Sequence, residues 1–345
     1  MANEGTESFL SGASEEVDDF LSGLDEDDDS EEEPSGGFLS GVEEQSADDS
    51  DKVSYKPTIH FKSSEDMAEM DDESVQLIVT SPPYNADWAY GSHDDNMDYQ
   101  YEYLPMLARV FKECWRVLKP SGRLVVNVPN LLRGGASGGQ AILSDIDTML
   151  NEKVELWGVP PHSHHGDVEG ELDCIRECME ETSFVHREWV IWNKGFNTDG
   201  LAPNGSFPRP GGVLLNNMHE GISVYQKPGD RDYSDMPDER IEESKIDKNE
   251  DDLCDDVWDI SPESWTFKYV DGEDVPPFPE ELVRRCVALW TYKDDTVLDP
   301  FAGRFTVGKV AKQMDRHAIG YELREELRKD IEEYTGMNQS GLDNW

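Results

Sequence analysis

The sequence predicts an α/β fold, a mostly parallel sheet with helices on both faces, preceded by an acidic N-terminal tail. Short apolar runs alternate with stretches of helical spacing, and turns rich in proline and glycine separate them. Residues 1–50 hold 18 acidic side chains and neither lysine nor arginine. Such a segment cannot offset the entropy lost on folding, so we expect residues 1–52 to be disordered. The folded domain is predicted to span residues 53–345.

The first elements of that domain form a strand, helix and strand unit. We predict strands at 58–61, 75–79 and 124–128. Between the last two, residues 99–118 show helical apolar spacing, with Pro105 in the first turn, where its missing N–H costs little. Residues 119–122, Lys-Pro-Ser-Gly, predict the turn that ends the helix. This order is a βαβ unit of a parallel sheet.

The remaining elements continue the alternation. We predict helices at 142–150, 172–179, 279–290, 305–314 and 324–334, and strands at 185–192, 221–225, 296–298 and 318–321. Three segments are expected to be irregular: a flexible Gly-rich stretch at 134–139, a long loop at 193–217 and a polar insert at 228–256. The domain then divides into residues 53–195, a connecting region at 196–256 and residues 257–345.

Charge and cysteine content constrain the environment. The chain has 345 residues, a net charge of −46 and a pI near 4.2. In dilute salt this charge would repel nucleic acids and anionic membranes, but at molar salt the Debye length shrinks to about 3 Å. We therefore expect a cytoplasmic protein of a high-salt, archaeal-type cytosol. Five cysteines and the lack of a long apolar run predict neither a disulfide framework nor a membrane span.

The acidic tail repeats one short motif. Phe-Leu-Ser-Gly occurs at residues 9–12, 20–23 and 38–41. One interpretation is low-complexity drift, and the other is a docking motif for the groove of a protein partner. The sequence does not predict the oligomeric state.

The most informative stretch follows the second predicted strand. Residues 75–79 run into Ser81-Pro82-Pro83-Tyr84. A prolyl pair holds the backbone rigid and extended at the carboxyl end of a strand, where open α/β sheets bind ligands. A hydroxyl, a free carbonyl and an aromatic face there suit a flat base with an exocyclic amine. The stretch alone is equally consistent with a proline-bracketed turn.

A second motif favours the ligand-binding interpretation. The strand at 296–298 runs into Asp299-Pro300-Phe301-Ala302-Gly303 and a helix, and Glu322 ends the next strand. A glycine lets the backbone approach a nucleotide, and an acid after the following strand accepts hydrogen bonds from ribose hydroxyls. Asp299 suits a ligand with an ammonium group and a sulfonium, not a pyrophosphate.

Together the two motifs resemble those of the β group of DNA amino-methyltransferases, which transfer a methyl group from S-adenosylmethionine to cytosine N4 or adenine N6. The catalytic loop precedes the cofactor loop, which is the permuted order of that group, and the resemblance covers roughly residues 55–335. It extends to 188–194, 256–260 and 278–282. It implies a Rossmann-like methyltransferase sheet, double-stranded DNA as partner and a nucleoid-associated location. Within the group, the leading Ser81 is similar to the cytosine-N4 branch, and the acidic chain resembles haloarchaeal CTAG-type modification methylases of restriction–modification systems.

The resemblance also implies the site residues. The catalytic ones are Ser81, Pro82, Pro83 and Tyr84. Those that bind S-adenosylmethionine are Asp299, Pro300, Phe301, Gly303, Thr306, Glu322, Phe278 and Pro279. Two departures stand out: Gly303-Arg304-Phe305-Thr306 lacks the family's second glycine, and Pro276-Pro277 replaces a frequent His-Pro pair. The first predicts either a different turn or an altered cofactor affinity.

The implied mechanism needs no covalent intermediate. The hydroxyl of Ser81 and the carbonyl of Pro82 would accept the two amine hydrogens and turn the nitrogen lone pair toward the methyl group. Tyr84 would stack on the flipped base, with Trp88 and Tyr90 either beside it or in the core.

Base reading is expected from the loop at 196–218. Five polar side chains there are candidates, and the spacing does not choose among them: Asn197, Asn204, Arg209, Asn216 and Asn217. Two other functions stay open, adenine-N6 or RNA amino-methylation and an inactive nucleic-acid-binding module.

We predict no metal site. His162, His164 and His165 precede Cys174 and Cys178, but the spacing matches no standard zinc motif.

Overall fold

The computed structural model describes residues 54–85, 88–90, 93–95, 97–130, 132–134, 138–151, 169–195, 204–215, 218–247, 249–262 and 279–337. The predicted tail, residues 1–52, and its three repeats lie outside the described residues. No helix in the described part of the chain combines the length and the apolar character that a bilayer crossing requires.

The predicted α/β sheet is present and has eight strands. Their spatial order is β1 (Thr58–His60), β14 (His317–Tyr321), β13 (Thr296–Asp299), β2 (Val75–Thr80), β5 (Leu118–Val128), β11 (His219–Gln226), β8 (Val185–Asn193) and β12 (Val257–Asp259). All neighbours pair in parallel except β11, which runs antiparallel to both β5 and β8. The expectation of a mostly parallel sheet is confirmed, with one reversed strand.

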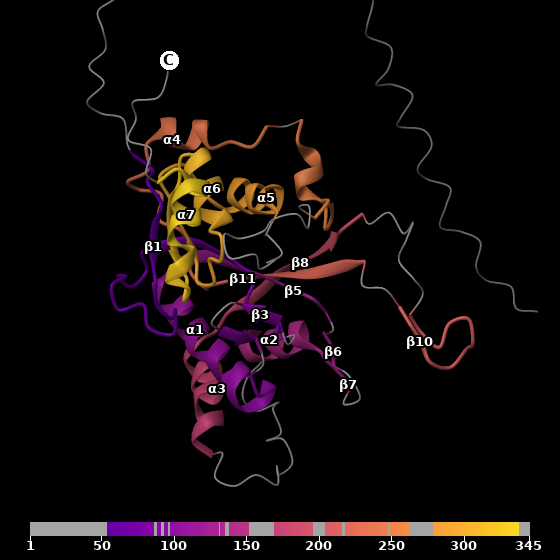
Figure 1. Ribbon diagram of the computed structural model, residues 1–345. Coiled ribbons are helices and arrows are strands. Elements are labelled where there is room, and N and C mark those ends of the chain that lie inside the picture. The colour runs from indigo at the N-terminus through magenta and orange to yellow at the C-terminus, as the bar shows by residue number, and fades with distance from the viewer. Residues whose placement is uncertain are drawn as a thin grey trace, which may run out of the picture. The chain divides into compact units, whose positions relative to one another are not determined.

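Helices cover both faces of the sheet (Figure 1). One face carries α1 (Leu104–Val117), α2 (Ile142–Asn151) and α3 (Glu169–Glu181), and the other carries α5 (Glu280–Trp290), α6 (Thr306–Gln313) and α7 (Arg328–Thr335). Side chains of the central strands alternate between the two layers. In β5, Leu124 and Val126 enter the first core and Val125 enters the second. This period of two follows from the pleat of a strand buried on both sides.

The chain connections diverge at one point of the sheet. From β13 the chain continues to β14 on one side, whereas from β2 it continues to β5 on the other side. β13 and β2 are neighbours, so their carboxyl ends meet at the point where the connections diverge. Open α/β sheets bind their ligands at such a switch point. Asp299 ends β13, and Thr80 ends β2 directly before the Pro-Pro loop.

Two predicted features of the βαβ unit are present with differences in detail. The predicted single helix at 99–118 begins instead as a π turn, η2 (Tyr99–Tyr103), capped by the side chain of Asp98, and α1 follows. The predicted turn at 119–122 lies within β5, where Ser121 has a φ of 64° and the pairing register shifts between Val75 and Leu77. Leu118 pairs with Val75 and Arg123 with Leu77, so residues 119–122 pair with no residue of β2 and the predicted turn is an irregularity within β5.

Short ribbons occupy segments that the sequence predicted to be irregular. β6 (Leu132–Gly134) pairs with β7 (Gly138–Gln140) at the predicted flexible stretch, and β9 (Asn204–Gly205) pairs with β10 (Val213–Leu214) in the predicted long loop. A third ribbon joins β3 (Trp88–Tyr90) and β4 (His93–Asp95). The β9–β10 ribbon projects beyond the ends of β8 and β11 (Figure 1).

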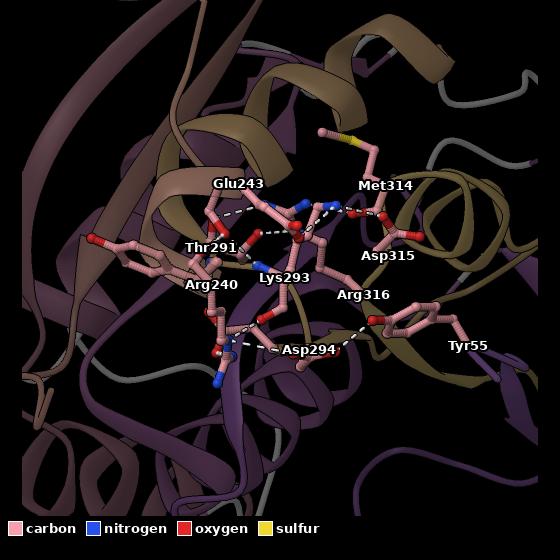
Figure 2. Close-up of polar contacts among 12 residues, drawn as sticks. Tyr55, Arg240, Glu243, Thr291, Lys293, Asp294, Met314, Asp315 and Arg316 are labelled. Atoms are coloured by element: carbon pink, nitrogen blue, oxygen red, sulfur yellow. Dashed lines mark hydrogen bonds and ion pairs between the residues drawn. The ribbon is translucent and has the colours of Figure 1, made fainter. Parts of the chain in front are cut away.

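The polar insert at 228–256 is more ordered than predicted. It contains α4 (Asp238–Glu243) and the 3-10 turn η4 (Asp251–Cys254). Arg240 donates to the buried carboxylate of Asp295 at 2.9 Å and to the carbonyl of Lys293, so α4 is fixed to the start of β13 (Figure 2). Arg231 donates to the same Asp295 oxygen at 2.7 Å. These contacts lie at the amino end of β13, opposite Asp299.

Candidate active site

The loop after β2 is fastened from two sides. The hydroxyl of Tyr103 donates to the carbonyl of Pro83 at 2.7 Å. Asn85, at a φ of 55°, exchanges two hydrogen bonds with the backbone of Met97, at 2.9 and 2.8 Å. Pro82 is buried, and Pro83 is half-buried. The rigidity expected from the two prolines is therefore reinforced by neighbouring segments.

A chain of hydrogen bonds runs from this loop into the sheet. The Ser81 hydroxyl donates to the Tyr84 hydroxyl at 3.2 Å, and Tyr84 donates to Glu220 Oε2 at 3.1 Å. Glu220 lies near the start of β11, 136 residues from Tyr84 in sequence. Glu220 is 7% exposed as a residue, so the loop after β2 rests on a buried acidic residue.

Two further polar side chains hold that carboxylate. Asn127 of β5 donates to Glu220 Oε2 at 2.9 Å and approaches the Tyr84 hydroxyl at 3.4 Å. Lys194, directly after β8, forms an ion pair with Glu220 Oε1. None of the three residues was predicted from the sequence. Lys194 follows an apolar run, Glu220 precedes one and Asn127 lies within one, but nothing in the sequence says that β5, β11 and β8 are neighbours.

The second predicted motif forms the adjoining part of the site. The Thr80 hydroxyl donates to Asp299 Oδ1 at 2.9 Å, which joins the two motifs directly. The backbone N–H of Phe301 donates to the same oxygen at 3.1 Å. Oδ2 accepts no hydrogen bond from the described residues. Burial and, to a smaller extent, the nearby Glu322 raise the pKa of Asp299 to about 7, against the lowering effect of those two hydrogen bonds.

The turn after Asp299, which lacks the family's second glycine, holds two residues in the left-handed region. Gly303 has a φ of 51°, and Phe305 has a φ of 65° and a ψ of 45°, both in the left-handed region. Phe305 therefore adopts a conformation that usually needs glycine. Arg304 directs its guanidinium over the ring of Tyr334, 3.7 Å from the centroid. A Cβ built on Gly303 would meet nothing within 4 Å, so the loop faces open space there.

Glu322 lies where the sequence places it, directly after β14. Its Oε1 accepts the backbone and side-chain N–H groups of Arg324, both at 3.0 Å. Oε2 accepts none from the described residues. The effect of Glu322 on the Asp299 pKa places the two carboxylates within electrostatic reach. The cofactor that the resemblance implies carries two positive centres and two ribose hydroxyls, and these two carboxylates match that donor pattern.

The structure does not bring every predicted residue to the site. Pro300 is buried directly after Asp299, and Thr306 is buried at the start of α6. Pro279 occupies the N-cap position of α5. Phe278 lies outside the described residues, as do Asn197, Asn216 and Asn217. The side chains of Trp88, Tyr90 and Asn204 are also outside the description, although their backbones form strands.

The topology and the site at the switch point define the methyltransferase class of α/β protein. A family model described as DNA methylase, of the N6 and N4 type, matches residues 75–333. The chain therefore belongs to the DNA methylase family.

Individual relatives agree with this assignment. The Type II methyltransferase M.MjaI of Methanocaldococcus jannaschii is 26% identical over 309 residues, covering 82% of this chain and 92% of that protein. M.Cfr9I of Citrobacter freundii is 29% identical over 264 residues, covering 73% and 78%.

Solved structures show the same fold. The DNA modification methylase TTHA0409 of Thermus thermophilus, solved in complex with S-adenosyl-L-methionine, has a TM-score of 0.57 and 25% identity, covering 83% and 97% of the two chains. The PvuII DNA methyltransferase, which is cytosine-N4-specific, has a TM-score of 0.54 at 17% identity, covering 85% and 89%. The latter likeness concerns the fold alone.

The raised pKa of Asp299 predicts a pH-dependent cofactor affinity. A cationic ligand favours the carboxylate, so below pH 7 binding must first remove a proton. We expect the Kd for S-adenosylmethionine, measured by calorimetry, to rise by up to about tenfold for each pH unit below 7. Replacing Asp299 with Asn should weaken binding and flatten the profile. The variant Asp235→Asn, an exposed acid in the insert, should keep the wild-type profile.

In the ligand-free protein, the contribution of Asp299 to the free energy of unfolding should fall as the pH rises, whereas its contribution to cofactor affinity should rise. Because the folded-state pKa of about 7 exceeds the ordinary value of 3.8, the folded state holds the proton more tightly. The contribution of Asp299 to the free energy of unfolding is present below pH 4 and declines as the pH rises to 7. A cofactor affinity that is constant between pH 5 and 8 would contradict the role given to Asp299.

Proposed function

We propose that this DNA methyltransferase transfers a methyl group from S-adenosyl-L-methionine to the exocyclic N4 amine of a flipped cytosine in duplex DNA. The observation that carries the choice of base is Ser81 at the head of the Pro-Pro loop, the residue type of the cytosine-N4 branch. Ser81 directly follows Thr80, whose hydroxyl donates a hydrogen bond to Asp299. The amine-binding and cofactor-binding groups thus adjoin at one switch point.

The chemistry required of the chain is positioning. The cytosine amine is a poor nucleophile because its lone pair is delocalised into the ring. Ser81 Oγ and the Pro82 carbonyl would accept its two hydrogens and turn the nitrogen toward tetrahedral geometry, which frees the lone pair. The cofactor supplies a methyl group on a positively charged sulfur, and Asp299 would orient its cationic part.

The cysteines support amino-methylation over methylation at cytosine C5, which needs a thiolate nucleophile. Burial raises the pKa of Cys178 to about 12, and it raises the pKa of Cys114 and Cys286 even more. Burial also raises the pKa of the half-buried Cys174. Cys254 is exposed but lies in η4 of the insert. Thiolates of such high pKa are not formed at neutral pH.

We further propose that the β9–β10 ribbon reads the target sequence. Backbone bonds and the Ser206 hydroxyl close its tip, with Ser206 N–H donating to Gly212 at 2.9 Å and Ser206 Oγ donating to Arg209 at 2.7 Å. Arg209 is exposed and forms no ion pair with a described residue. The chain has no acidic residue from 200 to 219, despite 76 elsewhere. A two-stranded ribbon fits the major groove, and arginine is the commonest reader of guanine.

The remaining assignments are also proposals. Since its relatives include Type II methyltransferases, the enzyme would protect DNA in a restriction–modification pair. Its net charge of −46 favours a halophilic cytosol, and the tail repeats would dock a protein partner.

Nucleoside mass spectrometry tests the reaction. Wild-type enzyme is incubated in high salt with duplex DNA or RNA and with cofactor labelled on the methyl group. We expect N4-methylcytosine in DNA. N6-methyladenine, or label in RNA, would mean that the enzyme carries out the same amino-methylation on another substrate. The absence of label, with cofactor binding intact, would indicate a binding module and refute the proposal.

A further inference from the structure

We propose that Glu220 is a positioning residue that sets the direction of the hydrogen bonds holding the target amine, acting through Tyr84. The inference rests on the proposed function in one respect, namely that Ser81 Oγ receives an amine hydrogen. It does not depend on which base carries the amine.

Glu220, Tyr84 and Ser81 form a chain of hydrogen bonds whose direction depends on which groups can donate. An ionised carboxylate can only accept hydrogen bonds, whereas the Tyr84 and Ser81 hydroxyls each have one hydrogen to donate. Glu220 Oε2 lies 3.1 Å from the Tyr84 hydroxyl, so Tyr84 commits its hydrogen to the carboxylate. The Tyr84 oxygen then accepts from two donors, Ser81 Oγ at 3.2 Å and, at the longer distance of 3.4 Å, the Asn127 side-chain amide.

The consequence appears at the Ser81 oxygen. Since its only hydrogen is committed to Tyr84, Ser81 Oγ can act toward a bound base only as an acceptor. That is the polarity which an amine donor requires. Glu220 does not touch the base, yet it fixes the role of the atom that does.

The surroundings pair the Glu220 carboxylate and hold it in place. The residue is 7% exposed, and a buried charge is costly unless it is paired and hydrogen-bonded. Lys194 supplies the counter-charge on Oε1, and Asn127 donates to Oε2 at 2.9 Å. The lysine ammonium also lies 4.6 Å from the ring centroid of Trp192. The three polar residues come from β5, β8 and β11, which are paired side by side.

The same arrangement implies selection for amines over carbonyls. Thymine and uracil place a carbonyl oxygen where cytosine has its amine. With the Ser81 hydrogen committed, two acceptor oxygens would face each other, and the site rejects such a base. A neutral amide at position 220 can donate as well as accept, so it would permit the chain of hydrogen bonds to reverse.

A double-mutant cycle tests this role. The variants are Glu220→Gln, Tyr84→Phe and both together, with kcat measured under saturating DNA and cofactor. We expect each single change to lower kcat by about 10- to 100-fold, below the loss for a group that touches the reacting atoms, with KM and the cofactor Kd changed less than about threefold. The double variant should stay within about threefold of Tyr84→Phe, because both changes break one chain.

Matched controls separate this role from a structural one. Glu239→Gln alters an exposed acid of α4 and should keep wild-type kcat. Glu220→Asp retains an acceptor-only group and should recover part of the kcat lost in Glu220→Gln. Independent, multiplying losses in the double variant would overturn the inference, as would an unchanged kcat in Glu220→Gln. If Glu220→Gln does not fold, Tyr84→Phe alone decides, and wild-type kcat in that variant overturns the inference.

The outcome is distinguishable from failure of the proposed function. The double-mutant cycle measures kcat on whichever amine the wild type methylates. If the wild type forms N6-methyladenine, the proposed base is wrong, and the cycle still tests the role of Glu220. A wild type that forms N4-methylcytosine while the losses multiply refutes the inference alone. A wild type that transfers no methyl group to any base refutes both.

Discussion

Replacing both Ser81 and Tyr84 with alanine is expected to abolish methyl transfer while leaving cofactor binding intact. Removal of one preorganised hydrogen-bonding group at a reacting centre costs about 10²–10³ in kcat, and the double change also removes the aromatic face. We therefore expect a loss of at least about 10³-fold, measured as label transferred to DNA in single turnover. The Kd for S-adenosylmethionine should change less than about threefold, because Asp299 and Glu322 are untouched.

Controls for this prediction use the same residue types away from the site. Ser183 is exposed between α3 and β8, and Tyr233 is exposed against Tyr292 before the start of β13. The variant Ser183→Ala, Tyr233→Ala should retain wild-type turnover. Normal turnover by the Ser81, Tyr84 variant would refute the site assignment. A loss of cofactor binding in that variant would instead indicate a collapsed switch point.

Replacing Phe305 with alanine is expected to lower the free energy of unfolding by about 3–5 kcal/mol, the usual cost of emptying a fully buried phenylalanine site. The ring is 0% exposed and lies between two glycines. A Cβ on Gly308 would lie 2.5 Å from Phe305 Cε1, and one on Gly320 would lie 2.6 Å from Cε2. Both glycines therefore provide the space that this ring fills.

Phe305→Gly isolates the backbone strain. At a φ of 65° an L-residue is disfavoured by about 1–2 kcal/mol, and glycine is not. We expect Phe305→Gly to be about 1 kcal/mol more stable than Phe305→Ala, yet less stable than wild type. Urea unfolding in high salt measures both. Phe207→Ala, at a residue 56% exposed, should change stability by less than about 0.5 kcal/mol. A Phe305→Gly protein as stable as wild type would refute the packing argument.

Most of the fold was predictable because its signals are local. Apolar runs such as 75–79 and 296–298 are strands buried on both faces, and such strands show a continuous apolar pattern. The turn predicted at 119–122 is an irregularity inside β5, where the pairing with β2 passes from Leu118 directly to Arg123 and Ser121 has a φ of 64°. The insert at 228–256 was predicted to be irregular because the partners of Arg240 lie 53 and 55 residues away in sequence.

The candidate site was predictable in the same measure. Ser81 to Tyr84 and Asp299 to Gly303 are contiguous motifs that each follow a strand, so their positions followed from the sequence. The direct bond between Thr80 and Asp299 agrees with the proximity implied by a shared switch point. Glu220, Lys194 and Asn127 could not be predicted, because an acid, a base and an amide near strand ends carry no local signature.

The sequence by itself predicted the two loops, since each is a contiguous motif after a strand, and their resemblance to a known family implied the class of protein and the permuted order. The tertiary structure alone decided what lies beneath the catalytic loop and how the cofactor loop accommodates Phe305. The reversal of β11 places Glu220 next to β5 and β8. Gly308 of α6 and Gly320 of β14 leave room for one ring. Both depend on contacts between segments whose distance in space is set by the sheet, and chain-local patterns do not record that distance.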